Sequence, residues 1–308
     1  MRAAGNEVTL APPADTGRLC AVVVSYFPDD GLPSRVARIA AQAGKVFLVD
    51  NATTGPAIGA IEAAAHQANV VLLRNANNRG VAGGLNAGLD AALREGFACA
   101  ILFDQNSDPD PALASTLLAL WRDLAASDRP ALLGTNYIDR HRDRPALHCA
   151  DGEQVAAQTA VIISGTLLSL EAYKAIGPFR EEFFMDLVDT DFCHRARNLG
   201  YGVYASCEPL MQHAVGHATS RSILGHRIWV SNHPAWRRYL MVRNSLILQA
   251  EAGQSGAGWL LRTFAKQLRK SLHVLLYEKD GLAKVRAMWR GFRDGIRRDT
   301  RCKPWEPS

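Results

Sequence analysis

The sequence lacks several features that would place it in other classes of protein. No two of its six cysteines form a C-x-x-C pair, so a zinc site or a disulfide framework has little support. We therefore expect free, partly buried thiols in a reducing compartment. No stretch approaches the ~18 consecutive apolar residues of a membrane-spanning helix. Residues 1–17 lack the apolar core of a secretory signal, which predicts a flexible tail and a cytoplasmic protein.

A glycine fingerprint for dinucleotides is also missing. G-x-G-x-x-G should directly follow the first strand, but the segment "VVVSYFPDDG" does not contain it. This argues against a dinucleotide-dependent oxidoreductase. What is present is typical of a soluble globular protein, with 48% hydrophobic and 21% charged residues in a chain of 308.

Apolar runs alternate with helical patterns over the first part of the chain. The runs are bounded by turn residues, and the helical segments have apolar residues three and four apart. Strands are predicted within 18–30, 45–55, 69–80 and 98–108, and helices within 32–44, 57–68, 81–96 and 110–127. Such a βαβ series predicts a mostly parallel sheet with helices on both faces.

The pattern becomes less regular after about residue 130. Further strands are predicted at 130–139 and 159–170 and a helix at 171–179, and from 232 onward the pattern is helical, amphipathic and basic. We expect a catalytic domain over 18–250 and a basic helical appendage over 251–308.

Polar side chains stand where each predicted strand ends. Ligands of open α/β sheets bind beyond the carboxyl ends of the strands, so these residues should line one crevice. They are Ser25 and Tyr26, Asp50 and Asn51, Arg74 and Asn75, and Asp104, Gln105 and Asn106.

The segment "ILFDQNSDPD" has the most carboxylates of these strand ends. Carboxylate and amide oxygens suit a hard divalent cation, which would neutralise a leaving diphosphate. Alternatively, Ser107 or Asp108 caps the next helix, with Pro109 or Pro111 in its first turn. Capping does not account for Asp104, which lies within the end of the strand.

Two further segments carry polar residues at helix starts. In "RNANNRGVAGGLNAG" small residues allow close helix–sheet packing. Asn77, Asn78 and Asn86 could donate hydrogen bonds to an anionic group near the helix start. In "FFMDLVDTDFCHRARNLG" the i,i+3 pair Asp186 and Asp189 would share one side of a helical turn, and a carboxylate there suits a general base. Helix capping with pairing of the acids to Arg195 or Arg197 explains the segment equally well.

Taken in order, these segments resemble the inverting glycosyltransferases of family 2 with the GT-A fold. The resemblance is narrower to bacterial rhamnosyltransferases of polysaccharide and O-antigen assembly. It covers residues 18–250 and is carried by "VVVSYFPD", "VFLVDNATTG", "RNANNRGVAGGLNAGL", "ILFDQNSDPD", "ISGTLLSLEAYKAIGPFREEFFMDLVDTDFCHRARNLGY" and "MQHAVGHATSR". It implies a GT-A fold with a mixed, mostly parallel sheet, followed by C-terminal amphipathic helices.

The resemblance also implies residue roles. Asp189 would be the catalytic base, and Asp104, Asn106 and His213 would bind Mg²⁺ or Mn²⁺. The nucleotide sugar would be bound by Ser25, Tyr26, Asp50, Asn51, Arg74, Asn78, Gly80, Asn86, Asp104, Gln105, Ser164, Gly165, Asp186 and Arg195.

This sequence departs from the family pattern at two positions. Asn106 stands at the second acidic position of the D-x-D metal motif; its amide oxygen can ligate the metal but adds no charge, so we expect weaker metal affinity. Val188 replaces the Glu of the Glu-Asp pair, while Asp186 lies three positions before the base. The rhamnosyl branch often carries that Asp, so Asp186 is interpreted as a contact to the sugar of the donor.

The implied reaction moves a sugar, expected to be L-rhamnose from dTDP-β-L-rhamnose, onto a hydroxyl of a saccharide or a polyprenyl-diphosphate-linked saccharide. A UDP-hexose donor is the first alternative. A nucleotide- or nucleic-acid-binding protein without transferase activity is the alternative from another class, although it leaves the acidic strand ends unexplained.

The charge is concentrated at the C-terminal end. Residues 262–303 hold thirteen Lys or Arg and four Asp or Glu, a net charge of +9 in a chain of +5. Basic amphipathic helices with aromatic residues are typical of membrane interfaces. We expect this region to bind an anionic membrane surface, as a peripheral protein, rather than nucleic acid. A solvated helical pair or a homo-oligomer contact is the alternative.

Overall fold

The structure is a computed structural model that describes residues 18–139, 144–213, 219–223, 226–230 and 232–303. Its main sheet has the strand order β3-β2-β1-β4-β9-β6-β10-β5, with β7 beside β6 and β8 beside β10. The strands are β1 (Leu19–Ser25), β2 (Lys45–Asp50), β3 (Val70–Arg74), β4 (Cys99–Asp104), β5 (Asp108–Pro109), β6 (Pro130–Asp139), β7 (Arg144–Pro145), β8 (Val155–Ala157), β9 (Thr166–Ser169) and β10 (Gly202–His213). A separate two-stranded sheet pairs β11 (Thr219–Ile223) with β12 (His226–Val230).

The predicted mixed, mostly parallel sheet is confirmed. The first four strands pair in parallel, as do β6 and β10, whereas β9 runs antiparallel between β4 and β6. The strand predicted over 159–170 is too long, because only Thr166–Ser169 pairs as β9. Gly165 has φ +74°, a left-handed conformation that turns the chain immediately before β9.

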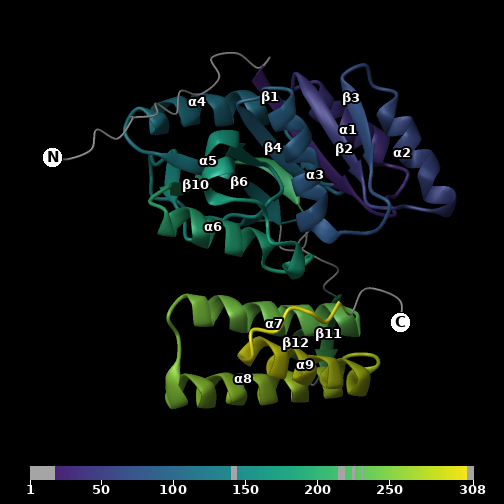
Figure 1. The fold of residues 1–308 in the computed structure, drawn as a ribbon, viewed down its shortest axis with the longest axis vertical. Helices are drawn as coiled ribbons and strands as arrows, with labels where there is room; N and C mark the ends of the chain where they lie inside the picture. The colour runs from purple at the N-terminus through teal and green to yellow at the C-terminus, as the bar shows by residue number, and fades with distance from the viewer. Residues whose placement is uncertain (1–17, 140–143, 214–218, 224–225, 231, 304–308) are drawn as a thin grey trace. The chain divides into compact units, whose positions relative to one another are not determined.

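Helices cover both faces of this sheet, as predicted (Figure 1). They are α1 (Leu32–Ala40), α2 (Ile58–Ala65), α3 (Gly80–Arg94), α4 (Leu113–Ala125), α5 (Leu170–Ile176) and α6 (Val188–Asn198), with short 3₁₀ turns η2 (Gly55–Ala57) and η3 (Glu181–Phe183). The helices α1, α2 and α4 share one hydrophobic core with alternate residues of β1, β2 and β4. Residues of α3 contact the other side chains of β1.

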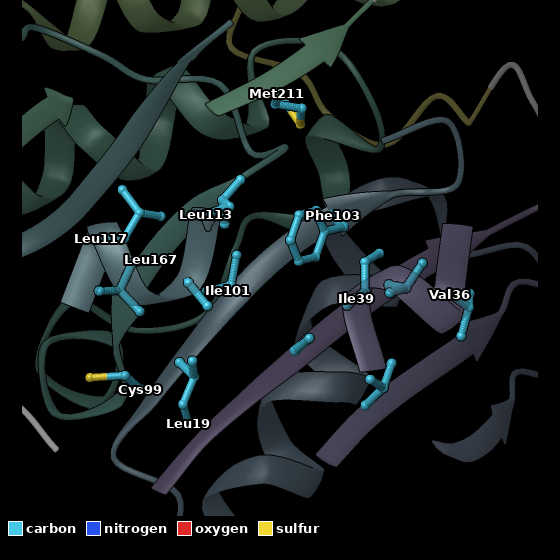
Figure 2. Close-up of a cluster of buried hydrophobic side chains, with 14 of the residues drawn as sticks. Leu19, Val36, Ile39, Cys99, Ile101, Phe103, Leu113, Leu117, Leu167 and Met211 are labelled. Carbon is cyan, nitrogen blue, oxygen red and sulfur yellow. The ribbon is translucent and has the colours of Figure 1, made fainter. Parts of the chain in front are cut away.

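Figure 2 shows the core between the sheet and α1 and α4. Val36 and Ile39 of α1, Leu117 of α4 and the strand residues Ile101 and Phe103 belong to one buried cluster. Burying each such side chain stabilises the fold by about 1.5–3 kcal/mol. Successive residues of a strand point to opposite faces of the sheet. This core therefore fixes which side chains of β1, β2 and β4 face α1, α2 and α4, and which face α3.

Glycines in α3 allow this helix to approach β1 closely. A Cβ on Gly88 would lie 2.4 Å from Val22 Cγ1, and one on Gly84 would lie 2.6 Å from Val24 Cγ1. The side chains of β1 therefore occupy the space that other residues would need. This agrees with the predicted use of small residues for helix–sheet packing.

Gly88→Ala should lower the free energy of unfolding by about 1–3 kcal/mol, because overpacking forces the helix or Val22 to move. Gly59→Ala in α2 is the matched control, since a Cβ added at Gly59 would meet no heavy atom within 4 Å. That control should be neutral or stabilising by up to about 1 kcal/mol. Urea unfolding of both variants measures the difference, and equal stabilities would contradict the close packing of α3.

The expectation of thiols throughout is wrong for two cysteines. Cys149 and Cys207 form a disulfide, with their Cα atoms 5.8 Å apart, whereas Cys20, Cys99, Cys193 and Cys302 are thiols. Asn136 lies beside this pair, and its Nδ2 donates to the carbonyls of Leu147 and Cys207, 2.9 Å from each. This amide holds the 146–154 loop against β10. The two cysteines are 58 positions apart, so the sequence alone does not show that they are close in space.

Reduction of this disulfide should lower the free energy of unfolding by about 2–4 kcal/mol, because it releases a long loop of the unfolded chain. Thermal unfolding with and without a phosphine reductant measures the loss, and the Cys149→Ser/Cys207→Ser variant should be insensitive to the reductant. Alkylation of the denatured, unreduced protein should modify the four thiols and leave the disulfide pair unmodified. Modification of every cysteine in the chain would show that the bond is absent.

The chain divides into two compact units, residues 1–179 with 192–213 and residues 180–191 with 214–308. The second unit contains α7 (Ala235–Glu251), α8 (Gly256–Tyr277) and α9 (Gly281–Ile296), with α9 packed against both α7 and α8 (Figure 1). This confirms helices at the C-terminal end. Among the described residues, no helix is both long and apolar enough to cross a membrane.

Candidate functional site

The ends of three neighbouring strands bring candidate residues together. In the parallel register Ser25 of β1 pairs with Asp50 of β2, and Val24 pairs with Asp104 of β4. Ser25 and Asp50 are almost fully buried, at 1% and 4% exposure. Three residues far apart in sequence thus lie side by side at one edge of the sheet.

The carboxylate of Asp104 organises the loop that follows β4. Its Oδ1 accepts hydrogen bonds from the Asn106 backbone N–H (2.8 Å) and the Ser107 hydroxyl (3.0 Å). Its Oδ2 accepts from the Ser164 hydroxyl at 2.9 Å. The bond to the Asn106 N–H is the local side-chain turn that Asp favours, and the Asn106 residue is exposed.

Gly165 is needed for Ser164 to reach Asp104. Its backbone N–H donates to the carbonyl of Leu102 at 2.8 Å, and an added Cβ would lie 2.4 Å from Thr135 Cγ2. Because of this contact and the left-handed φ, any residue other than glycine would be strained at this position.

Gln105 joins the ends of β1 and β4. Its Oε1 accepts from the Tyr26 backbone N–H (2.7 Å) and the Ser25 hydroxyl (3.2 Å). Its carbonyl accepts from Arg35 Nε at 2.6 Å. Sequence reasoning missed Arg35, which also pairs with Asp29 at 2.6 Å. The available signal was that Arg35 is a cationic residue in the helix that follows the first strand.

Asp50 and Asn51 hold the loops after β2 and β3. Asp50 Oδ1 accepts from the Thr53 backbone N–H at 2.9 Å. Asn51 Nδ2 donates to the Gly80 carbonyl (2.7 Å), and its Oδ1 accepts from Asn75 Nδ2 (2.8 Å). The side chain of Asn51 is therefore a structural link to the start of α3, beside the buried carboxylate of Asp50.

Several other predicted residues have protein partners of their own. Arg74 pairs with Glu62 at 3.0 Å, and Asn78 Oδ1 accepts from the Gly80 N–H at 2.9 Å. The Asp108 carboxylate pairs with Arg38 on α1 at 2.8 Å and lies in β5. Asp108 is therefore no helix cap: α4 begins only at Leu113, so that alternative is wrong.

Asn86 and Arg195 are occupied within the protein. Asn86 Nδ2 donates to the Phe179 carbonyl at 2.9 Å, and its Oδ1 accepts from the Phe179 N–H (2.9 Å) and the Tyr173 hydroxyl (3.1 Å). Arg195 donates to the carbonyls of Ile176 (3.0 Å) and Pro178 (2.9 Å). Both side chains hold the segment after α5. Their binding of the nucleotide sugar, which the resemblance implies, stays a prediction.

The second unit contains Asp186 and Asp189. Asp189 lies in the first turn of α6, where its Oδ1 accepts from the Thr190 N–H at 2.7 Å. The expected helical i,i+3 relation is wrong, because Leu187 between them has φ +65° and the helix begins at Val188. Even so, the negative charge of Asp189 acts on Asp186 and contributes to raising its pKa.

Burial raises the pKa of both carboxyl groups. For Asp189 the hydrogen bonds from Thr190 oppose the effect of burial, and for Asp186 the opposing charge is that of Arg237. Arg237 Nε lies 3.2 and 3.3 Å from the two carboxylate oxygens of Asp186. A raised carboxyl pKa is the property that a general base operating near neutral pH requires.

Side chains of α7 hold the segment before Asp189. Asn244 Nδ2 donates to the carbonyls of Phe183 (3.0 Å) and Asp186 (2.8 Å). Arg243, which is fully buried, donates to the Glu182 carbonyl. Sequence reasoning missed these residues. The available signal was the spacing of Arg237 and Asn244, seven positions apart, which places both on one face of a helix.

Unfavourable backbone conformations occur beside these residues. Phe27, Ala52, Phe184 and Leu187 have φ between 47° and 65°, and each lies within three positions of Ser25, Asp50 or Asp186. A left-handed backbone at a residue other than glycine costs about 1–3 kcal/mol and often occurs at functional sites.

The predicted contact of His213 with the metal concerns a side chain outside the described residues, although the backbone of His213 ends β10.

Comparison with known proteins supports a glycosyltransferase fold. No family model matches the chain. The chain is 28% identical over 242 residues to the dTDP-rhamnosyl transferase RfbF of Shigella flexneri, covering 74% of this chain and 78% of that protein.

Similar solved structures also support a glycosyltransferase fold. The structure of S. aureus TarS 1-349 in complex with UDP-GlcNAc matches with a TM-score of 0.58 at 15% identity, covering 90% of this chain and 81% of that one. The mannosyltransferase PcManGT from Pyrobaculum calidifontis in complex with GDP-Man and Mn²⁺ matches with a TM-score of 0.50 at 17% identity, covering 89% and 73%. The chain spans 37% of a longer S. aureus TarS structure. The chain therefore has the GT-A fold of nucleotide-sugar glycosyltransferases.

Proposed function

We propose that this protein is an inverting glycosyltransferase that uses a nucleotide sugar. The observation that carries the proposal is the alignment of Ser25, Asp50 and Asp104 at neighbouring strand ends of a GT-A fold. Ligands of such sheets bind beyond these ends. The resemblance of the surrounding sequence to family 2 supports the same assignment.

In this proposal the residues of the sheet edge bind the donor. The buried carboxylate of Asp50 accepts a hydrogen bond from the pyrimidine base. Tyr26, which is 44% exposed beside the Ser25–Gln105 link, lines the nucleotide site. Ser164 and Gly165 lie near the sugar, since Ser164 is tied to Asp104.

The donor set at Asp104 fits a hard divalent cation. The carboxylate of Asp104 and the exposed amide of Asn106 supply oxygen ligands, which Mg²⁺ and Mn²⁺ prefer. We propose that these two residues, with His213, hold such an ion. When bound, the ion neutralises charge on the leaving diphosphate.

Asp189 is proposed as the base of a single displacement. Its carboxylate takes the proton of an acceptor hydroxyl as that oxygen bonds to the anomeric carbon, and the nucleoside diphosphate leaves with the electron pair of the broken C–O bond. Asp186, held by Arg237 and Asn244, contacts the sugar. Inversion converts a β-linked donor sugar into an α-linked product.

The proposed donor is dTDP-β-L-rhamnose. Similarity to the Shigella protein named a dTDP-rhamnosyl transferase supports this choice. A UDP-sugar is the second candidate, because similar structures have been solved with UDP and UDP-GlcNAc. The proposed acceptor is a saccharide, free or linked to a polyprenyl diphosphate, which would place the enzyme at the inner face of a membrane.

A thermal-shift and donor-hydrolysis screen tests the function. Ligands that bind only the folded state raise the melting temperature, so dTDP with Mn²⁺ should do so, whereas NAD or an oligonucleotide should not. Nucleotide release should be fastest from dTDP-rhamnose among dTDP-rhamnose, UDP-glucose, UDP-galactose and UDP-GlcNAc. Stabilisation by the oligonucleotide but by no nucleoside diphosphate would replace the proposal with a nucleic-acid-binding role.

A further inference from the structure

The helix α8 carries a row of exposed leucines on one face. Helical spacing of three, four and seven places them on one side of the helix. The leucine row consists of Leu261, Leu268, Leu272, Leu275 and Leu276, which are 70, 56, 56, 43 and 63% exposed.

The face of α8 that is buried is the more polar one. Gln267 and Ser271 are buried there with Val274. Phe264, which is 45% exposed between this face and the leucine row, packs its ring 5.2 Å from that of Trp289 on α9. An amphipathic helix ordinarily buries its leucines and exposes its polar residues. In α8 this order is inverted, and among the described residues the leucine row keeps 43–70% of each side chain exposed.

A row of basic residues borders the leucine row. It consists of Arg262, Lys266, Arg269 and Lys270, and α8 contains no Asp or Glu from Gly256 to Tyr277. At 100° per residue these four side chains occupy the arc next to the leucines and away from α9. Apolar residues beside unbalanced positive charge fit a surface that is apolar inside and anionic outside.

We propose that the leucine row of α8 docks on an anionic lipid bilayer. The helix lies in the plane of the interface, with the leucines among the acyl chains and the basic row at the lipid phosphates. A second copy of the chain is a poorer occupant, because pairing two such faces would bring two basic rows together without acidic partners. The docking itself does not depend on the proposed function. Only its benefit to the enzyme, access to a lipid-linked acceptor, rests on that function.

The structure also separates the two basic helices that the sequence pattern treats alike. In α9, Trp289 and Phe292 pack against Phe264 of α8. The aromatic residues of α9 therefore support α8, and α8 provides the docking face.

Co-sedimentation of the full chain with lipid vesicles tests the proposal. The chain should bind vesicles that contain about 25% phosphatidylglycerol, in phosphatidylcholine, at least roughly tenfold more tightly than pure phosphatidylcholine, because the basic row adds attraction to anionic lipid. Leu268→Ser/Leu272→Ser should weaken that binding by a similar factor, and so should Arg269→Gln/Lys270→Gln. Leu199→Ser is the matched control, since Leu199 is 52% exposed in the other unit, and it should bind like the parent chain.

Two outcomes would overturn the proposal. One is equal vesicle binding by the parent chain and the Leu268→Ser/Leu272→Ser variant. The other is a parent chain that ignores vesicles but is a dimer in light scattering, with the same variant monomeric; the occupant would then be a second copy. Stabilisation by dTDP, measured on the same samples, should be unaffected by these substitutions. Loss of vesicle binding with retained dTDP binding therefore separates failure of docking from failure of the transferase assignment.

Discussion

Replacing Asp189 by Asn is expected to reduce sugar transfer by about 10²–10⁴-fold, the contribution typical of a general base. The amide keeps the shape of the side chain and can still accept the hydrogen bond that Thr190 donates. It cannot take a proton from the acceptor hydroxyl. Donor binding, measured as stabilisation by dTDP, should therefore stay near that of the parent chain.

The pH dependence of transfer should have an acid limb set by Asp189. Because burial raises the pKa of this carboxyl, the rate should fall at a higher pH than an ordinary aspartate would give. Asp110→Asn is the matched control, since this exposed carboxylate accepts a comparable bond from the Ala112 N–H (2.8 Å). The control should keep both rate and acid limb; near-normal turnover in Asp189→Asn would remove Asp189 as the base.

The same substitution should not destabilise the fold at neutral pH. A folded-state pKa above the unfolded value means that the folded chain binds the proton more tightly. The free energy of unfolding therefore decreases as the pH rises from the unfolded to the folded pKa of Asp189. Asparagine carries no charge to bury, so the melting temperature of Asp189→Asn should equal or exceed that of the parent at neutral pH. Replacing a functional residue often stabilises a protein in this way.

The part of the fold with local, periodic signals is predictable from sequence. The segment "PALLGTNYID" matches β6, Pro130–Asp139, and the polar strand ends follow from the apolar runs before them. These features depend on neighbouring residues, whose periodicity is visible in the chain. The sequence predicts that these ends line one crevice, and the structure adds the order β2-β1-β4 that brings Ser25, Asp50 and Asp104 together.

What could not be predicted depends on contacts between distant segments. The disulfide joins Cys149 to Cys207 across 58 positions, and the donor to the carbonyl of Asp186 comes from Asn244, also 58 positions later. The left-handed Leu187 has no sequence signature, since leucine rarely adopts that conformation. The exposure of the leucines of α8 is equally hidden, because hydrophobic spacing shows a stripe but not whether it is covered.

The second large effect concerns the acid at the end of β4. Asp104→Ala removes the acceptor of three hydrogen bonds, from Asn106, Ser107 and Ser164, and the charged oxygen ligand of the proposed cation. Transfer should fall by at least about 10²-fold, as when a group that stabilises transition-state charge is lost. Stabilisation by dTDP should also lose its dependence on Mn²⁺.

Asn106→Asp tests why an amide stands beside that acid. Asn106 is exposed, so an added carboxylate there carries little burial cost and brings a second negative charge to the oxygen ligands of Asp104. The variant should therefore bind Mn²⁺ more tightly, by roughly tenfold if the new charge contributes about 1.4 kcal/mol. Calorimetric titration of Mn²⁺ in the presence of dTDP measures the affinity of the parent and the variant. If the two affinities are equal, Asn106 does not face the cation and the metal position belongs to Asp104 with other ligands.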